Sequence, residues 1–431
     1  MFSRSVQSSE YVIADFPRAG GWGITRLGVG LIIPVVLLLL VGLVCIHATD
    51  RVTPVTPAAV SDEPKFTQSS WVERAYDWLG ANTRRQLLFF LTGIVLLGLT
   101  LLPSYHRIGR WTYVIYSVSI AMLSLLIIDR YIVDIHDSIV PIRRETRRWI
   151  TFGNLIGIQP SEFMKVALVL VLARYLRYRD SYRSWPGLIP PFLLTLLPMV
   201  LILKQPDLGT LLMLLPVLFC MLFVAGARIR HLATIVLLGC AVLPVFYFVG
   251  MAPYQRERIQ VMFKQNIDSE AWHMDQGYQL RQAKIALGTG GVLGEGYGQG
   301  VFLESRLALL PEEHNDFIFS IIGHQFGLVG CCFVMLCYAA IVLFGVEIAA
   351  ATNDPFGRLL AVGVIVMIVV QALLNMCMNI GLAPITGMPL PFVSAGGSSL
   401  WANFLALGLL LNVAKRRPMF IANPPFEHHD D

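Results

Sequence analysis

The sequence predicts an all-α membrane protein with about ten transmembrane helices, a large outer loop between the seventh and eighth, and a re-entrant Pro/Gly-rich loop before the tenth. Hydrophobic residues make up 55% of the 431 positions and charged residues only 14%, a balance that lies outside the range of soluble domains. Apolar runs are spread over almost the whole chain, so one membrane domain at 28–414 is favoured over several soluble domains. Polar tails at 1–27 and 415–431 flank it.

Ten apolar runs approach the length of about 20 residues that a helix needs to cross the hydrocarbon core. They lie near residues 28–48, 86–104, 111–130, 161–176, 187–204, 208–226, 232–250, 316–346, 357–380 and 398–414. The fourth is short and carries Glu162, Lys165 and Arg174, so hydropathy supports it least. The first 26 residues lack the pattern of a cleavable signal peptide, and we expect the first run to remain as an anchor.

Basic residues in short loops orient the helices, because lysine and arginine are retained on the cytoplasmic side. They occupy alternate loops, at 107–110, 174–183, 228–230 and 415–417. This pattern predicts that both termini are cytoplasmic and that three segments are outside: 49–85, 131–160 and 251–315. The loop "IRRETRRWITFGN" is basic and yet falls outside, which indicates either a functional need for cations there or a miscounted span.

Two features of the chain are interpreted as structural. All seven cysteines lie inside apolar runs, without the spacing of a metal site or a disulfide framework, and are taken as packing residues. In the first outer segment, a capping box formed by Ser70 and Glu73 precedes apolar residues at helical spacing. This segment is predicted to be an amphipathic helix that lies on the membrane surface.

Polar interruptions of the apolar runs are the candidate functional positions, because ionisable groups at membrane depth are costly. Glu162 and Lys165 lie three residues apart on one helical face. They form either a buried structural ion pair or a site in which the lysine faces an anionic ligand. In "LKQPDLGT", Pro206 ends a helix and Asp207 is favoured as the cap of the next, while Lys204 and Gln205 lie at the edge of the hydrocarbon.

Two glycine-rich stretches cannot be continuous helix. Residues 381–400, "GLAPITGMPLPFVSAGGSSL", predict a re-entrant loop that faces an internal cavity, because non-helical backbone at membrane depth must be buried in protein or line water. Residues 288–300, "GTGGVLGEGYGQG", match neither the dinucleotide nor the Walker pattern. This second stretch is either a backbone that turns tightly or approaches a ligand closely, or simply a flexible loop.

The stretch "PEEHNDFIFS", residues 311–320, places acids and a histidine at the threshold of an apolar run. Asp316 is either a functional acid or, like Asn315, a helix cap. Cations gather in the same outer region, at Arg143, Arg144, Arg147, Arg148, Lys165 and Lys204. Such cations suit a lipid that carries phosphate or pyrophosphate, and a carboxylate that they keep ionised could act as a general base on a hydroxyl.

These stretches resemble the SEDS family (shape, elongation, division and sporulation), which includes RodA and FtsW. The resemblance spans about residues 147–413 and rests on "RRWITFGNLIGIQPSEFMKVALVLVLARYL", "KQPDLGT", "YQRERIQVMF", "GYQLRQAKIALGTGGVLGEGYGQG", "LPEEHNDFIFSIIGHQFGLVG" and "APITGMPLPFVSAGGSS". It implies a ten-span peptidoglycan glycosyltransferase that polymerises lipid II on the outer face of the bacterial inner membrane. The chain departs from the family at His324, Gln325 and Phe326, where two acids and a leucine are usual, and at Ala395, where an aromatic residue is common.

The resemblance implies a role for Asp316 as the catalytic base that removes the proton from the C4 hydroxyl of the acceptor. Undecaprenyl pyrophosphate would leave with inversion at the anomeric carbon, and Lys165 and arginines would stabilise its charge. With the resemblance and the cation cluster, we assign the following residues to substrate binding: Arg148, Trp149, Glu162, Lys165, Lys204, Gln205, Asp207, Glu312, His314, Ser398 and Ser399.

The resemblance also implies partners. A class B penicillin-binding protein, which crosslinks strands, is expected beside the chain, together with lipid II, undecaprenyl-linked glycan and membrane lipids; no nucleic acid is expected. A divalent cation, Mg²⁺ or Mn²⁺, could assist, although Asp134, His136 and Asp137 fit a solvated loop better than a metal site.

Alternatives to this function stay open. The wording of "KIALGTGG" and "GLAPITGMPLPFVS" favours the RodA-like elongation branch, which acts in cell shape, over an FtsW-like division enzyme. A lipid II flippase is a second possibility, because interrupted helices are also typical of transporters. In a third, the chain is a non-catalytic scaffold in which Asp316 only caps a helix.

Overall fold

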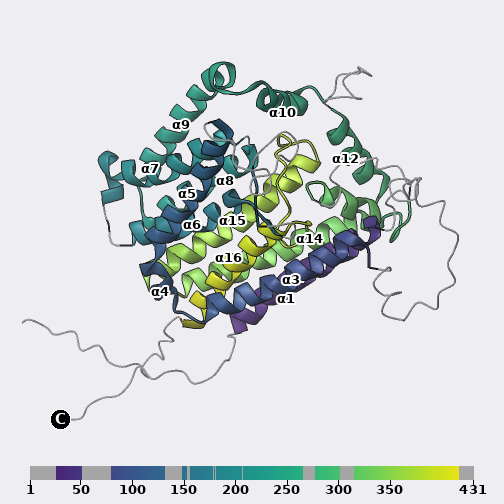
Figure 1. Ribbon diagram of the computed structural model, residues 1–431, viewed down its shortest axis with the longest axis horizontal. Helices are drawn as coiled ribbons and strands as arrows, with labels where there is room; N and C mark the ends of the chain where they lie inside the picture. The colour runs from purple at the N-terminus through teal and green to yellow at the C-terminus, as the bar shows by residue number, and fades with distance from the viewer. Residues whose placement is uncertain are drawn as a thin grey trace, which may run out of the picture.

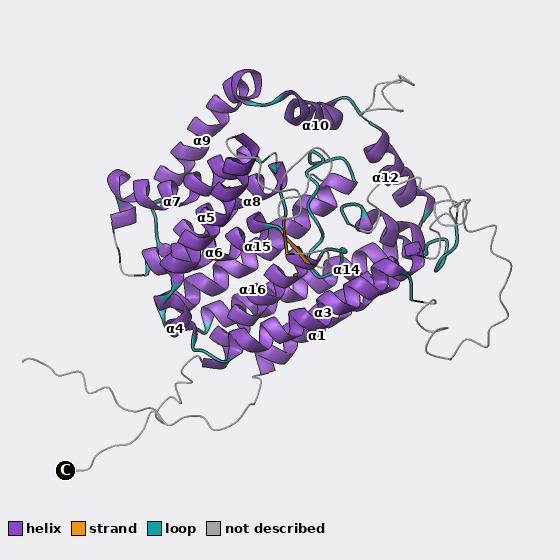
Figure 2. Ribbon diagram, in the orientation of Figure 1, coloured by secondary structure: helices purple, strands orange, loops and turns teal. Residues whose placement is uncertain are grey.

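The computed structural model describes residues 26–50, 79–131, 148–152, 156–177, 179, 181–205, 207–265, 277–300 and 315–416 (Figure 1). These residues are predominantly helical, with one short hairpin among them (Figure 2). The hairpin consists of β1 (Ile150–Phe152) and β2 (Ile156–Ile158), which pair antiparallel with Ile150 opposite Ile158. The predicted amphipathic helix at 70–79 and both predicted tails fall almost wholly outside the described residues.

Each of the ten predicted runs coincides with a helix. The helices are α1 (Arg26–Asp50), α3 (Ala81–Leu101), α5 (Thr112–Tyr131), α6 (Pro160–Leu176), α7 (Trp185–Lys204), α8 (Leu208–Ala225), α9 (Ile229–Val245), α14 (Ile318–Ala350), α15 (Pro355–Asn379) and α16 (Gly397–Arg416). Within the described parts of the chain, nine helices are long and apolar enough to cross a membrane. The exception is α6, which has 17 residues and so lies at the lower limit for a span.

Burial divides these helices into an inner and an outer set. Almost every residue of α6 and α16 is buried, including the polar Glu162 and Lys165. In contrast, α7 and α9 leave large apolar side chains uncovered, with Leu193 65% and Leu237 70% exposed. Apolar surface on this scale is costly in water and stable in hydrocarbon. The outer set therefore presents the lipid-facing surface, and the inner set forms the core.

Shorter elements connect the spans on the predicted outer side. The helix α9 continues through a π-helical turn, η3 (Phe246–Gly250), to α10 (Pro253–Phe263), and α12 (Tyr278–Thr289) follows. In Figure 1, α9, α10 and α12 run in sequence along the upper edge of the molecule. The helix α12 packs against α14 and α15. On the opposite side, α4 (Tyr105–Arg110) and the single-turn η2 (Ser181–Arg183) lie between spans.

The predicted break before α16 is present. Residues 381–396 contain no helix, yet most of them are buried. Side chains of neighbouring helices satisfy this backbone: Gln86 donates to the Ser394 carbonyl at 3.2 Å and Tyr338 donates to the Pro391 carbonyl at 2.6 Å. Such pairing is required where water is absent. The loop is thus held from α3 on one side and from α14 on the other.

Candidate active site

Asp316 lies in the turn that precedes α14 and is half-buried. Two asparagines of α15, one helical turn apart, donate to its backbone carbonyl: Asn375 Nδ2 at 2.8 Å and Asn379 Nδ2 at 3.3 Å. Asn375 Nδ2 also donates to the carbonyl of Met388 at 2.7 Å. The side-chain amide of Asn375 therefore holds the main chain of Asp316 and also holds the non-helical loop.

The first turn of α14 is capped from another helix. Its N-cap residue is Phe317, which makes no side-chain cap bond. The N–H and the hydroxyl of Ser320 donate to Asn379 Oδ1, at 3.2 and 2.6 Å. Asn379 therefore caps this N–H group. From the sequence, Asn315 and Asp316 had been the two candidates for the cap.

Gly387 of the non-helical loop lies beside the Asp316 carboxylate. A Cβ atom at Gly387 would lie 3.3 Å from Asp316 Oδ2 and 3.9 Å from Arg258 Nη1. The φ angle of Gly387 is +68°, which glycine adopts without the strain that a side chain brings. The carboxylate of Asp316 and the guanidinium of Arg258 in α10 therefore converge over a position that has no side chain.

Three charged groups from separate parts of the chain act on Arg258. Burial lowers the pKa of Arg258 and the charge of Arg148 lowers it further, whereas Asp316 and Asp207 raise it. Because arginine stays protonated in proteins, both guanidiniums remain cations. Two cations and two carboxylates are thus brought together from the segment before β1, from α10, from the start of α8 and from the start of α14.

Asp207 is the N-cap of α8, as the sequence favoured. Its Oδ1 accepts from the Thr210 N–H at 3.2 Å, and its Oδ2 accepts from the hydroxyls of Thr210 and Ser161 at 2.9 and 2.8 Å. Gln159 Nε2 donates to the same Oδ2 at 3.3 Å. A cap that also binds Gln159 and Ser161 joins the start of α8 to the start of α6.

Lys165 and Glu162 form a buried ion pair. The Lys165 Nζ lies 2.8 Å from Glu162 Oε2 and also donates to Gln371 Oε1 at 2.8 Å. Gln371 in turn donates to the Pro389 carbonyl at 2.8 Å. The two residues therefore form the buried ion pair that was one of the two interpretations of the sequence. It supports the loop two residues from Gly387.

The serine pair at the start of α16 has structural contacts in this arrangement. The hydroxyl of Ser398 donates to the Gly157 carbonyl at 2.9 Å and accepts from the Gln159 N–H at 3.1 Å, which ties β2 to α16. The hydroxyl of Ser399 accepts from Asn403 at 3.4 Å. The Trp149 ring packs near Gly157, 3.2 Å from where a Cβ would stand.

Four further residues were assigned to substrate binding from the sequence: Lys204, Gln205, Glu312 and His314. Gln205 is buried and donates to the Leu123 carbonyl of α5 at 2.8 Å, whereas Lys204 is exposed. Glu312 and His314 lie outside the described residues, as do Arg143, Arg144 and Arg147. Asp134, His136 and Asp137 do so too. Within the described ranges, no three His, Cys, Asp or Glu side chains are grouped as a metal ion would require.

Sequence reasoning missed Arg258 and three amides of α15. Arg258 lies in the quoted stretch "YQRERIQVMF". That stretch contains two arginines and two glutamines, and nothing in the sequence singles out one of them. A signal for the amides was available, because Gln371, Asn375 and Asn379 recur every four residues in an apolar run. This spacing aligns them on one helical face, where buried amides bond across helices.

The glycine-rich stretch follows α12 and closes onto the kink in α14. Gly327 has non-helical angles, φ 62° and ψ −158°, inside α14. Around it, the N–H of Glu295 donates to the His324 carbonyl at 2.9 Å, and that of Leu328 donates to the Gly291 carbonyl at 3.0 Å. A Cβ at Gly294 would lie 2.2 Å from the Gln325 carbonyl oxygen. Close approach to α14 thus explains Gly294, and likewise Gly290, where a Cβ would lie 1.9 Å from the Gly323 carbonyl oxygen.

Two of the departures from the family lie beneath this loop. His324 and Gln325 are both 1% exposed. His324 Nδ1 lies 2.9 Å from the Thr289 hydroxyl, at the end of α12. A Cβ at Gly300 would lie 2.5 Å from His324 Nε2. His324 therefore lies beside both ends of the glycine-rich stretch.

Comparison with known proteins agrees with this architecture. Stage V sporulation protein E of Bacillus subtilis (strain 168) is 32% identical over 392 residues, which covers 89% of this chain and 96% of that protein. Peptidoglycan glycosyltransferase MrdB of Escherichia coli (strain K12) is 34% identical over 284 residues, 66% of this chain and 75% of that protein.

Among solved structures, a chain described under "Structural coordination of polymerization and crosslinking by a peptidoglycan synthase complex" superposes with a TM-score of 0.68 at 26% identity, over 90% of this chain and 97% of that one. The family described as "Cell cycle protein", which comprises FtsW, RodA and SpoVE, matches residues 67–418. These matches confirm the resemblance and the polytopic helical fold. The chain belongs to the FtsW/RodA/SpoVE family of multi-pass membrane proteins.

Proposed function

We propose that this protein is a peptidoglycan glycosyltransferase that polymerises lipid II, with Asp316 as its general base. The observation that carries the proposal is the convergence of Asp316 and Arg258 over Gly387, where a carboxylate and a guanidinium flank a position with no side chain. Membership of a family whose relatives include a named peptidoglycan glycosyltransferase supports the reaction class.

The reaction transfers a glycan from a lipid carrier to a sugar hydroxyl. Asp316 accepts the proton from the C4 hydroxyl of the acceptor sugar as that oxygen attacks the anomeric carbon of the donor strand. The bond from this carbon to undecaprenyl pyrophosphate breaks, and its electron pair leaves with the pyrophosphate. A single displacement of this kind inverts the anomeric centre, and one positioned carboxylate is enough to serve as the base.

The neighbouring cations stabilise both the ionised base and the pyrophosphate leaving group. Arg148 and Arg258 favour the ionised form of a nearby carboxylate, which is the form that a general base requires. Guanidiniums also bind phosphate oxygens through paired N–H groups. When the donor bond breaks, negative charge grows on the pyrophosphate, and cations already in place stabilise the transition state.

The surrounding polar contacts position these groups. Asn375 donates to both the Asp316 carbonyl and the Met388 carbonyl, so one amide holds the base beside the loop. The buried pair of Lys165 and Glu162 reaches the same loop through Gln371. In this proposal, Lys165 contributes its charge to the pyrophosphate region from behind the loop.

The setting of the reaction is proposed from the predicted topology. The protein acts in the bacterial inner membrane with both termini in the cytoplasm and Asp316 at the outer face, as the alternating basic loops predict. A class B penicillin-binding protein crosslinks the strands beside it, in agreement with the solved chain that belongs to a peptidoglycan synthase complex. The RodA-like residue sequence of the motifs supports a role in elongation and cell shape.

The test is polymerisation by the purified protein with its penicillin-binding partner. Lipid II is incubated with the wild type or with Asp316→Asn, and the products are separated on a gel that resolves glycan strands. Asparagine preserves the size and capping ability of aspartate and removes its basicity. We expect strands from the wild type alone, with both proteins equally folded.

Two other outcomes contradict the proposal. Movement of labelled lipid II across sealed vesicles, without polymer and without effect of Asp316→Asn, indicates a flippase. Normal wall assembly in cells that carry Asp316→Asn indicates a scaffold in which this residue only supports the start of α14.

A further inference from the structure

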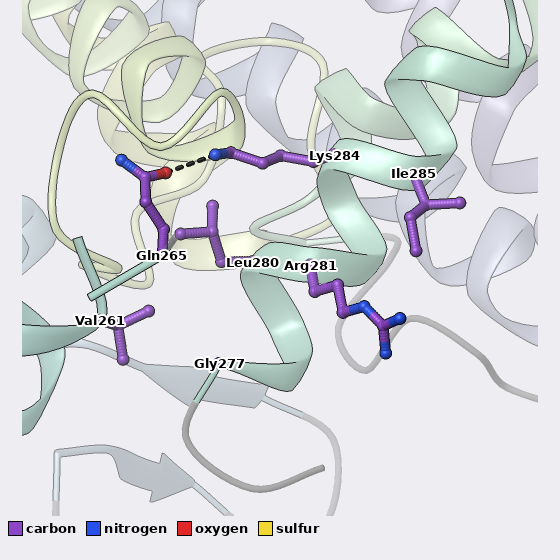
Figure 3. Close-up of a pocket in the computed structure, with 7 residues that line it drawn as sticks. All are labelled: Val261, Gln265, Gly277, Leu280, Arg281, Lys284 and Ile285. Carbon is purple, nitrogen blue, oxygen red and sulfur yellow. Dashed lines mark hydrogen bonds between the residues drawn. The ribbon is translucent and has the colours of Figure 1, made fainter. Parts of the chain in front are cut away.

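Two adjoining cavities lie between α10 and α12. The first, of about 220 Å³, is lined by Val261, Gln265, Gly277, Leu280, Arg281, Lys284 and Ile285 (Figure 3). The second, of about 200 Å³, is lined by Tyr254, Glu257, Arg258, Val261, Gln279 and Ile385. They share Val261 as a lining residue and are together called the α10–α12 groove. Each is smaller than the 300–1,000 Å³ that is usual for small-molecule sites, and only their combined volume falls within that range.

The inner end of the groove adjoins Asp316. Arg258 lines the second cavity, and its Nη1 lies 3.9 Å from the position of a Cβ on Gly387, which is itself 3.3 Å from Asp316 Oδ2. Ile385, which also lines this cavity, is two residues from Gly387. Arg258 therefore belongs both to the position over Gly387 and to the lining of the groove.

The outer end is bounded by a polar link between α12 and the non-helical loop. Lys284 donates to Gln265 Oε1 (Figure 3). Gln265 Nε2 donates to the Gly381 carbonyl at 3.5 Å. The cavity lined by Arg258 is thus related to the Asp316 side, and the cavity lined by Lys284 adjoins this polar link.

The lining suits a carbohydrate strand that carries carboxylates. Val261, Leu280 and Ile285 offer an apolar floor for the flat faces of sugar rings, and the amides of Gln265 and Gln279 can bond to hydroxyls. Lys284 and Arg281 supply cations, and in Figure 3 their side chains point in different directions from α12. A compact pyrophosphate needs cations that converge on one point, whereas a strand with spaced anionic substituents does not.

We infer that the α10–α12 groove holds the growing peptide-bearing glycan strand as it extends from Asp316, and thereby sets how many additions occur before release. This inference rests on the proposed polymerase function. A strand retained by several weak contacts remains close to the base between additions, which raises its effective concentration. Loss of these contacts affects the length of the product more than the rate of forming the first linkage.

The test compares strand lengths made by Lys284→Gln, Arg281→Gln and the double variant with those made by the wild type. Each protein is purified with its partner and given lipid II, and both the gel ladder and the initial rate of the first linkage are recorded. Lys264→Gln is the matched control, because Lys264 ends α10 without lining either cavity. Lys284→Arg tests whether restoring the charge restores the length.

We expect the mean strand length to fall roughly two- to five-fold for each single variant, as for one solvent-accessible charge pair, and further for the double variant. The first-linkage rate and the control should match the wild type, and Lys284→Arg should recover most of the length. Wild-type lengths in all variants, or a parallel fall in first-linkage rate and length, would overturn the inference while leaving the polymerase standing. Absence of polymer from the wild type would overturn the proposed function and this inference with it.

Discussion

Two carboxylates lie at opposite ends of this helical bundle, each beside arginine, and they are held in different ways. Asp354 caps α15 and accepts from the Gly357 N–H at 3.0 Å. Its two oxygens lie 3.3 Å from Arg177 Nη2 and 3.3 Å from His106 Nε2. The contacts of its carboxylate are therefore made within the chain and tie α4, α6 and α15 together.

Asp316 has a different environment. Its backbone carbonyl accepts from Asn375 and Asn379. Beside its carboxylate lies Gly387, which provides room where any other residue would place a side chain. The comparison teaches that the residue types alone do not separate a structural acid from a chemical one. What differs at Asp316 is the neighbouring glycine, which places no side chain beside the carboxylate.

Substitution of Asp316 is the most direct test of the difference between the two carboxylates. We expect Asp316→Asn to reduce polymerisation by about 10²- to 10⁴-fold, the usual contribution of a positioned general base, with no change in thermal stability. Strand synthesis on a gel and thermal unfolding in detergent measure the two effects. Equal loss of stability and activity would instead assign Asp316 to the same class as Asp354.

The buried ion pair of α6 gives the next largest effect. Lys165→Met leaves Glu162 buried without its cation, and removal of one partner of such a pair costs about 3–5 kcal/mol of unfolding free energy. The double variant Lys165→Met with Glu162→Leu should recover much of that stability but not the activity. Recovery of both would show that the pair has only a structural role.

The space beside Asp316 is tested by Gly387→Ala. The new methyl group would lie 3.3 Å from Asp316 Oδ2 and 3.9 Å from Arg258 Nη1, and a misplaced reacting group can cost roughly 10²-fold in rate. Gly298→Ala is the matched control, because Gly298 has the same φ of +68° and no atom within 4 Å of the added Cβ. Activity lost equally in both variants would attribute the effect to backbone strain and not to the filled space.

The smallest effect is expected at Asp354. Burial raises its pKa, but the bonds from His106 and Gly357 and the charge of Arg177 outweigh burial and lower the pKa from the ordinary 3.8. Its contribution to stability is therefore complete above that ordinary value and is lost as the pH falls through the lowered pKa. Asp354→Asn keeps the cap and removes the charge, and should cost about 1 kcal/mol at neutral pH.

This prediction is measured as the thermal midpoint against pH. The wild type should lose stability toward acid pH, while Asp354→Asn should show a smaller loss over the same range. Polymerisation at neutral pH should be unaffected. A variant whose midpoint has the wild-type pH dependence would show that other carboxylates dominate acid unfolding.

Local sequence patterns predicted much of the fold and part of the site. The ten apolar runs, the cap at Asp207 and the break before α16 were all readable, because span length, capping and proline disruption depend on residues close together in the chain. The motif resemblance identified the family. The pairing of Glu162 with Lys165 was also foreseen as one of two interpretations, since three residues along a helix bring side chains together.

The sequence by itself thus determined the class of protein, the course of its spans and the family. Only the tertiary structure decided which distant groups meet Asp316. Arg258, Gly387 and Asn375 are separated from it by 58 to 71 positions along the chain. The glycine-rich stretch was ambiguous for the same reason, since its partner, the kink at Gly327, lies on another element. Hydropathy and capping act over a few residues, whereas the packing of whole helices sets these contacts.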